Sequence, residues 1–148
     1  MPGTGSRAEP DEITLHASAV AVGDRAVLIE GRSGSGKSGL ALTLMAYGAQ
    51  LIADDRVTVT RRDGALRAAA PVAIAGRIEA RGVGILGADP VSDVPLHLAV
   101  ALDVEETDRL PPQRSKNLLG IHLPVVHYVA SAYFAPAILQ YLKGGRHD

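Results

Sequence analysis

The stretch Gly31-Arg32-Ser33-Gly34-Ser35-Gly36-Lys37-Ser38 decides the fold class of this chain. It matches G-x-x-x-x-G-K-[ST] at every fixed position. A continuous apolar run over residues 26–29 precedes it, and an apolar run suited to a helix over residues 39–48 follows it. The order of strand, glycine-rich loop and helix predicts a P-loop α/β domain with a mixed central β-sheet and flanking helices.

Each fixed residue of this loop has a physical role in binding a nucleotide. The glycines let backbone N–H groups turn toward a pyrophosphate, and the start of the helix adds a partial positive charge. Lys37 can reach the outer phosphates, and the Ser38 hydroxyl can bind Mg²⁺. A glycine- and serine-rich turn that merely begins a helix is the weaker interpretation, because a strand and a helix flank the loop. The loop alone does not separate ATPases, GTPases and small kinases.

Composition restricts the remaining possibilities. The chain has 148 residues, 47% of them hydrophobic, and no cysteine, which predicts one globular domain with a core that needs no disulfides. With 15 Lys and Arg against 16 Asp and Glu, the chain has a formal net charge of -1, so it has no net positive field that would attract nucleic acid. No apolar stretch reaches the roughly 20 residues of a membrane-spanning helix, and no secretory signal is visible. We expect no nucleic acid or membrane partner and a location in the cytoplasm.

Turn residues and apolar runs predict the order of the elements. Residues 1–12 are interpreted as a disordered tail and residues 13–148 as one folded domain. The density of glycine in residues 75–87 predicts a strand end passing into a flexible loop. The other expected elements are a hairpin over residues 14–29, a strand over 51–53, a hairpin over 57–70, a strand over 96–102, an exposed connection over 105–116, a strand over 118–129 and a helix over 132–142.

Two acidic residues end the strand that follows the P-loop helix. A strand tip at this point of the sheet lies beside the bound phosphates, so a carboxylate of Asp54 or Asp55 can be catalytic. If the strand continues through both positions, only one side chain points into the site. A magnesium ligand and a turn-forming pair without chemistry remain alternatives.

Other polar residues carry weaker signals. Glu79 and Arg81 are two residues apart on an extended segment, so they share a face and can hold a metal and a phosphate oxygen. A surface ion pair is an equally good interpretation of the two. His16, taken alone, is typical of a packed or surface histidine. The other histidines lack the spacing of a zinc site.

Four motifs occur together in the order and approximate spacing of one known family. They are His16 with the strand over residues 27–29, the P-loop, residues 51–57 (LIADDRV) and residues 78–85 (IEARGVGI). In these motifs the chain resembles the catalytic C-terminal domain of the HPr kinase/phosphorylase family, bacterial enzymes that phosphorylate a serine of the phosphocarrier protein HPr. The resemblance covers about residues 13–86 and extends weakly to Asp108-Arg109-Leu110. We interpret the chain as a short form without the family's N-terminal domain.

The resemblance implies a role for each matching residue. Asp54 would be the general base that accepts the proton of the target serine, with His16 close enough to influence that carboxylate. Lys37 would bind phosphate, Arg81 and Arg109 would stabilise the transferring phosphate, and Mg²⁺ would be held by Ser38 and Glu79.

The resemblance also implies ATP as the phosphate donor, HPr as the substrate and a homo-oligomer, a hexamer in the family. The family's arginine-containing stretch associated with phosphorolysis is absent, and residues 123–127 (LPVVH) are the nearest segment. A small-molecule kinase is an alternative, although no arginine-rich lid is visible. A nucleotide-binding regulatory module without phosphoryl transfer is another.

Overall fold

The computed structural model describes residues 11–148 of the chain. The predicted tail therefore lies almost entirely outside the described residues. Its elements, in chain order, are β1 (Glu12–Leu15), β2 (Ala17–Val22), β3 (Arg25–Glu30), α1 (Lys37–Ala46), β4 (Gln50–Ala53), β5 (Val57–Arg62), β6 (Ala65–Ala69), a short 3-10 helix (Val72–Ile74), β7 (Arg77–Ala80), β8 (Gly84–Gly87), β9 (Val94–Glu105), β10 (Arg114–Leu118), β11 (Ile121–Tyr128) and α2 (Phe134–Gly144).

The strands form one large mixed sheet, as the sequence predicts for a P-loop α/β domain, and one separate hairpin. The main path runs β1-β5-β6-β9-β3-β2-β4, with β11 paired to β9 and β10 to β11. Strand β9 runs parallel to β3 and to β11, whereas β2 runs antiparallel to both β3 and β4. The carboxyl ends of β3, β4, β9 and β11 therefore meet at one edge of the sheet, which is where α/β proteins bind ligands.

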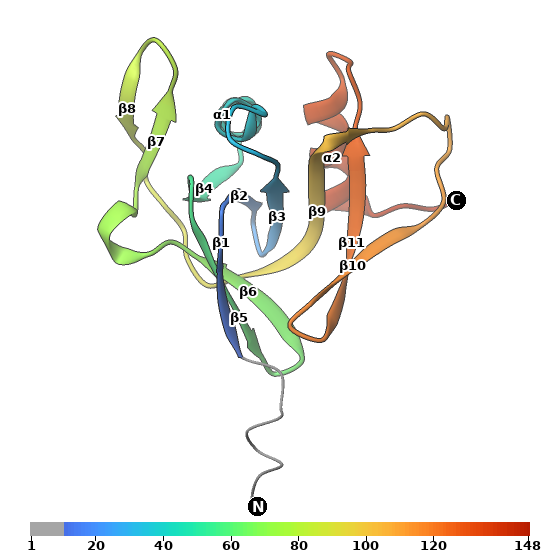
Figure 1. Ribbon diagram of the computed structural model, residues 1–148, viewed down its shortest axis with the longest axis horizontal. Coiled ribbons are helices and arrows are strands. Elements are labelled where there is room, and N and C mark those ends of the chain that lie inside the picture. The colour runs from blue at the N-terminus through green and yellow to red at the C-terminus, as the bar shows by residue number, and fades with distance from the viewer. Residues whose placement is uncertain (1–10) are drawn as a thin grey trace, which may run out of the picture.

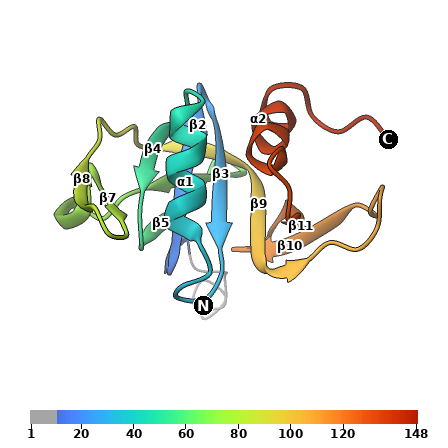
Figure 2. The same cartoon turned by 90° about the horizontal axis from the view of Figure 1, so that it is seen from above.

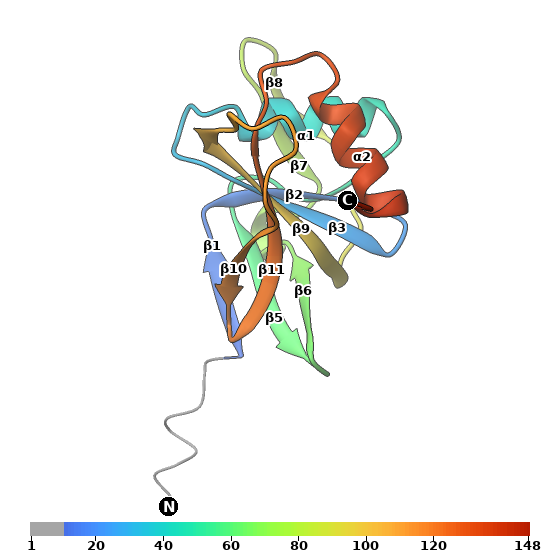
Figure 3. The same cartoon turned by 90° about the vertical axis from the view of Figure 1, so that its right-hand side faces the viewer.

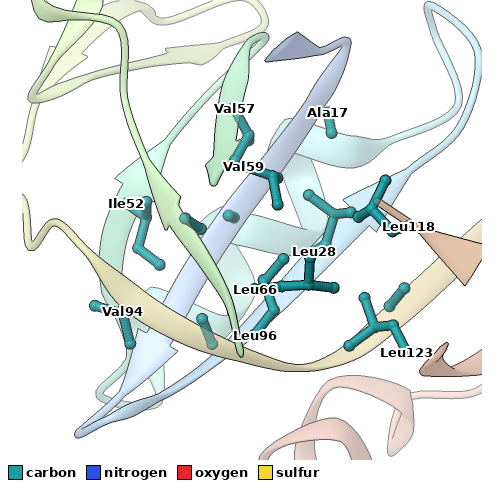
Figure 4. Close-up of a cluster of buried hydrophobic side chains, with 14 of the residues drawn as sticks. Ala17, Leu28, Ile52, Val57, Val59, Leu66, Val94, Leu96, Leu118 and Leu123 are labelled. Atoms are coloured by element: carbon teal, nitrogen blue, oxygen red, sulfur yellow. The ribbon is translucent and has the colours of Figure 1, made fainter. Parts of the chain in front are cut away.

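Alternate residues of the central strands face two separate cores. In β3, Leu28 belongs to one core, whereas Val27 and Ile29 belong to the other. Both helices cover the face with Val27 and Ile29, and the sheet curls so that β5, β6, β10 and β11 enclose the other face (Figures 1 and 3). Figure 4 shows the core that contains Leu28, which lies there among side chains of β5, β6, β10 and β11. Burial on both faces holds β3, and with it the P-loop, in place.

Local turn chemistry sets the hairpins, as predicted. Asp63 and Gly64 both have positive φ, 55° and 76°, the backbone that a two-residue turn between twisted strands requires. Gly23, at φ 61°, begins the turn between β2 and β3. The sequence predicts both hairpins because Asp and Gly tolerate this conformation without the strain of a larger side chain.

Three expectations about the second half are wrong in detail. Residues 77–87 form the regular hairpin β7–β8 rather than a flexible loop, because Gly82 at φ 83° supplies the turn while the flanking residues pair. The strand expected over residues 118–129 is divided between β10 and β11 by a turn at Leu119 and Gly120, both at positive φ. Strand β9 runs on to Glu105, so the expected exposed connection shortens to residues 106–113. Neither helix in the described part of the chain is long and apolar enough to cross a membrane.

Candidate active site

The P-loop connects the end of β3 to the start of α1 and has the backbone of an anion-binding loop. Gly34 and Gly36 adopt φ 81° and 100°, a region that other residues enter only with strain. Such left-handed positions let successive N–H groups form a concave nest for an anion. Gly31 is needed for another reason: a Cβ there would lie 2.4 Å from Ser35 Oγ and 3.3 Å from Leu102 Cβ.

Lys37, at the first position of α1, is held against the loop that it follows. Its Nζ donates to the carbonyl oxygens of Gly31, at 2.7 Å, and Arg32, at 3.0 Å. The side chain is buried, at 7% exposure, and lines the main pocket. The ammonium is therefore positioned beside the space that phosphate would occupy, and its two hydrogen bonds stabilise the loop.

Asp54, immediately after β4, is buried beneath the P-loop at the centre of a hydrogen-bond network. Its Oδ1 accepts from the hydroxyls of Ser18 and Ser38, both at 2.7 Å. Its Oδ2 accepts from the backbone N–H of Glu79 at 3.0 Å. One carboxylate thus joins β2, α1, β4 and β7. A carboxylate has about four acceptor positions, so one remains for a further donor.

Asp55 lies beside Asp54 but in a different environment. Strand β4 ends at Ala53, and Asp55 has φ 74°, so the alternation of an extended strand does not extend through the two aspartates. Asp55 lines the main pocket, and its Oδ1 lies 3.4 Å from Nδ1 of His16. Nε2 of the same histidine lies 3.3 Å from Ser33 Oγ. Within the described residues, His16 therefore contacts Asp55 and the P-loop, whereas the resemblance implies a position close enough to Asp54 to influence that carboxylate.

The main pocket has a volume of about 430 Å³ and opens beside the P-loop. Glu79 and Arg81 of the β7–β8 hairpin both line it, and that hairpin stands beside α1 (Figure 1). The lining residues are His16, Ser18, Ser33, Gly34, Gly36, Lys37, Ser38, Gly39, Leu42, Asp55, Glu79 and Arg81. The hairpin thus brings a carboxylate and a guanidinium to the phosphate-binding loop from a distant part of the sequence.

Five residues of the predicted site do not line this pocket: Gly31, Arg32, Ser35, Asp54 and Arg109. Asp54 is linked to the pocket through its hydrogen bonds with Ser18 and Ser38. Arg109 is exposed on the connection between β9 and β10 and does not line the pocket. The Arg32 backbone N–H donates to Asp103 at 2.9 Å, and its guanidinium is largely exposed. Ser35 lines a second cavity instead, and its Oγ is buried without a hydrogen-bond partner among the described residues.

Sequence reasoning missed the part played by Ser18. This serine is completely buried and donates to Asp54. It is the one polar residue in the strand Ala17–Val22, and a polar side chain in an otherwise apolar buried strand needs a partner. That pattern was the available signal. No sequence pattern indicates the contact between His16 and Asp55, because that contact depends on the positive φ of Asp55 just after β4 ends.

The fold and the loop together define a P-loop phosphate-binding protein of the α/β class. Residues 10–127 match the family model described as HPr Serine kinase C-terminal domain, and the chain belongs to that family. An HPr kinase/phosphorylase of Clostridium novyi is 35% identical over 117 residues, which cover 74% of this chain and 36% of the relative. A Clostridium kluyveri relative of the same name is 44% identical over 75 residues, covering 51% and 24%.

The structure titled as the Hpr(Ser) kinase/phosphatase from Coxiella burnetii has a similar fold. It superposes with a TM-score of 0.71 at 24% identity and covers 88% of each chain. The chain spans only about a third or a quarter of the length of the two curated relatives. The similarity therefore concerns the catalytic portion that these relatives share with this chain.

Proposed function

We propose that this chain is an ATP-dependent protein serine kinase that phosphorylates a serine of the phosphocarrier protein HPr. The observation that carries the proposal is the position of Asp54, which three donors hold under the P-loop next to Ser38. Membership of the HPr serine kinase family supports the choice of substrate. Membership of the family also supports a location in the cytoplasm. It supports assembly into a homo-oligomer as well, which the resemblance implies is a hexamer.

The P-loop and Lys37 would bind the phosphates of ATP. The Lys37 ammonium, which now donates to the carbonyls of Gly31 and Arg32, would also reach the outer phosphate oxygens. Arg81 reaches the same pocket from the hairpin and would offset charge on the transferring phosphate. Phosphoryl transfer needs mainly positioning and positive charge, and these groups supply both.

Magnesium would be held by the Ser38 hydroxyl and the Glu79 carboxylate. Both residues line one pocket, and Mg²⁺ in such sites takes one or two carboxylates together with phosphate oxygens and water. No group of three or more His, Asp or Glu suited to a metal occurs within residues 11–148, which fits a cation that arrives with its nucleotide. When bound, it neutralises phosphate charge.

Asp54 would be the general base. Its Oδ2 accepts one backbone N–H and keeps a position for the hydroxyl proton of the target serine. The serine oxygen then forms a bond to the γ-phosphorus, the bond from that phosphorus to the bridging oxygen breaks, and ADP leaves. In the phosphorylase reaction inorganic phosphate would attack the phosphorus of phosphoserine, the bond from that phosphorus to the serine oxygen would break, and pyrophosphate would leave, while protonated Asp54 returns its proton to the serine oxygen.

Asp55 is the second candidate for the base. Its carboxylate lines the pocket and has His16 beside it, whereas the Asp54 carboxylate lies deeper. The family resemblance favours Asp54, and access to the pocket favours Asp55. Substituting each by asparagine separates the two roles.

The direct test is to incubate the purified protein with ATP, Mg²⁺ and HPr and to locate phosphate by mass spectrometry. HPr with alanine in place of the target serine is the control. Phosphate on that serine alone would establish the kinase, and later addition of inorganic phosphate would test the reverse reaction. Tight ATP binding with unmodified HPr would overturn the proposal and favour a regulatory module.

A further inference from the structure

A second cavity lies next to the P-loop, on the side away from the carboxylates. Its volume is about 350 Å³. The lining residues are Ser35, Gly36, Leu40, Leu102, Tyr128 and Phe134. Ser35 and Gly36 belong to the P-loop, and Gly36 lines the main pocket as well. The two cavities thus meet at the phosphate-binding loop.

The strand order places the two cavities on opposite sides of β3. Strands β2 and β4, which lead to Ser18 and Asp54, lie on one side. Strands β9 and β11, which contribute Leu102 and Tyr128, lie on the other and run parallel to β3. Leu102 lies just beyond the pairing of Ala101 with Glu30, and Tyr128 ends β11, so both are at the edge of the sheet that carries the P-loop. Ligands of α/β sheets bind at this edge.

The walls of the second cavity suit a flat aromatic ring. Leu40 from α1 and Leu102 from β9 supply aliphatic surface, and none of the lining residues is charged. The rings of Tyr128 and Phe134 meet edge to face, with centroids 5.6 Å apart at 84°. Phe134 is buried, whereas Tyr128 keeps 37% of its surface exposed. Figure 2 shows that α2, which begins with Phe134, lies alongside α1.

We propose that this cavity binds the purine base of the nucleotide whose phosphates occupy the P-loop. The inference rests on the proposed function, since it requires a nucleotide. The base would pack against Tyr128 and between the side chains of Leu40 and Leu102, with the sugar crossing at Gly36. Stacking of a base on an aromatic side chain is a substantial part of nucleotide affinity in other proteins. Tyr128 and Leu40 are then binding residues, separate from those that hold phosphate.

The test compares ATP with inorganic tripolyphosphate, which has the phosphates but no base. Isothermal titration calorimetry in Mg²⁺ would measure both ligands on the wild-type chain and on the variants Tyr128→Ala and Leu40→Ala. We expect Tyr128→Ala to weaken ATP binding by about tenfold or more and to leave tripolyphosphate binding unchanged. Tyr128→Phe keeps the ring and should bind ATP as the wild type does. Tyr47→Ala removes an exposed tyrosine beyond the other end of α1 and is the matched control.

The outcomes separate the failure of this subsite from the failure of nucleotide binding. A wild-type chain that binds neither ligand would overturn the proposed function and the subsite with it. A wild-type chain that binds tripolyphosphate as tightly as ATP would overturn the subsite alone. Unchanged ATP affinity in both Tyr128→Ala and Leu40→Ala would also overturn it. So would an equal loss of affinity for ATP and for tripolyphosphate in both variants. A variant that loses affinity for ATP but not for tripolyphosphate supports the subsite, because its intact P-loop still binds tripolyphosphate.

Discussion

The hydroxyl of Ser38, in the first turn of α1, donates a 2.7 Å hydrogen bond to Oδ1 of Asp54 at the end of β4. This bond joins the phosphate-binding helix to the strand that carries the proposed base. The same carboxylate oxygen accepts from Ser18 of β2, which lies between β3 and β4 in the sheet. The P-loop and the proposed catalytic carboxylate therefore form one connected unit.

Asp54→Asn should destabilise the fold, and Asp55→Asn should not. Asp54 is 6% exposed and accepts three hydrogen bonds, and an amide cannot accept from all three donors. Hydrogen bonds to a charged group are worth about 1.5–3 kcal/mol each, so we expect a loss of about 1–3 kcal/mol in the free energy of unfolding. Asp55 is exposed and has φ 74°, which asparagine also tolerates. Urea denaturation of both variants checks this, and an equal loss in both would contradict it.

Gly31→Ala and Gly39→Ala should have opposite effects on stability. A Cβ at Gly31 would lie 2.4 Å from Ser35 Oγ, and also 3.0 Å from Ser35 Cβ and 3.3 Å from Leu102 Cβ, so rotation of the Ser35 hydroxyl alone does not make room for it. A Cβ at Gly39, inside α1, would meet nothing within 4 Å, and alanine has the better helix propensity. We expect Gly39→Ala to raise the free energy of unfolding by about 0.4–1 kcal/mol and Gly31→Ala to lower it. Thermal unfolding of the two variants measures both, and Gly31→Ala as stable as the wild type would refute the steric argument.

Lys37→Ala should remove measurable binding of ATP and of tripolyphosphate together. The ammonium is the buried positive charge of the P-loop, and its loss also leaves the carbonyls of Gly31 and Arg32 without their donor. Lys143→Ala, at the exposed end of α2, removes the same charge elsewhere and is the control. Calorimetric titration distinguishes the two variants. Equal affinities for both would show that Lys37 does not bind phosphate.

Stability should fall in acid through Glu106. The Arg114 guanidinium, which donates to both Glu106 oxygens, holds the pKa of that carboxyl below its ordinary value of 4.5, with help from the N–H groups of Asp108 and Thr107. A lowered pKa favours folding above the ordinary value, and this contribution disappears as the pH falls through the folded-state pKa. His127 Nδ1 lies 3.6 Å from Oε1 of the same carboxylate.

Glu106→Gln should remove that part of the pH dependence. Urea unfolding of the wild type and the variant at about pH 7 and about pH 4 gives the comparison. We expect the variant to be the less stable at the higher pH and the difference to shrink at the lower pH. A difference that is the same at both pH values would contradict the role assigned to the Glu106–Arg114 pair.

Sequence reasoning was most successful where local physical constraints decide the structure. The P-loop and the hairpin turn at Asp63 and Gly64 depend on residues that are neighbours in the chain, so their conformations could be predicted. The glycines of the β7–β8 hairpin resemble those of an irregular segment, so the sequence predicts a flexible loop where the two strands in fact pair. Their spacing does not reveal that the residues between them pair.

The site was predictable only in part, for the same reason. Lys37 and Ser38 follow from a contiguous motif. The spacing of Glu79 and Arg81 fits a surface ion pair equally well, and Arg81 lies in the turn after β7, so only the fold brings both residues to the pocket. The second cavity combines Leu102, Tyr128 and the P-loop, and these meet only through the order of strands in the sheet. Leucine and tyrosine carry no motif of their own, so no pattern in the sequence indicates them.

The measurement that tests the account most directly is phosphoryl transfer to HPr by the wild type and by Asp54→Asn, with ATP affinity measured on the same samples. We expect the wild type to phosphorylate one serine, and Asp54→Asn to bind ATP while its transfer rate falls by about 10²–10⁴-fold, the range for loss of a general base. A wild type that binds ATP and leaves HPr unmodified would contradict the account. An Asp54→Asn variant that transfers phosphate at the wild-type rate would contradict the role of Asp54.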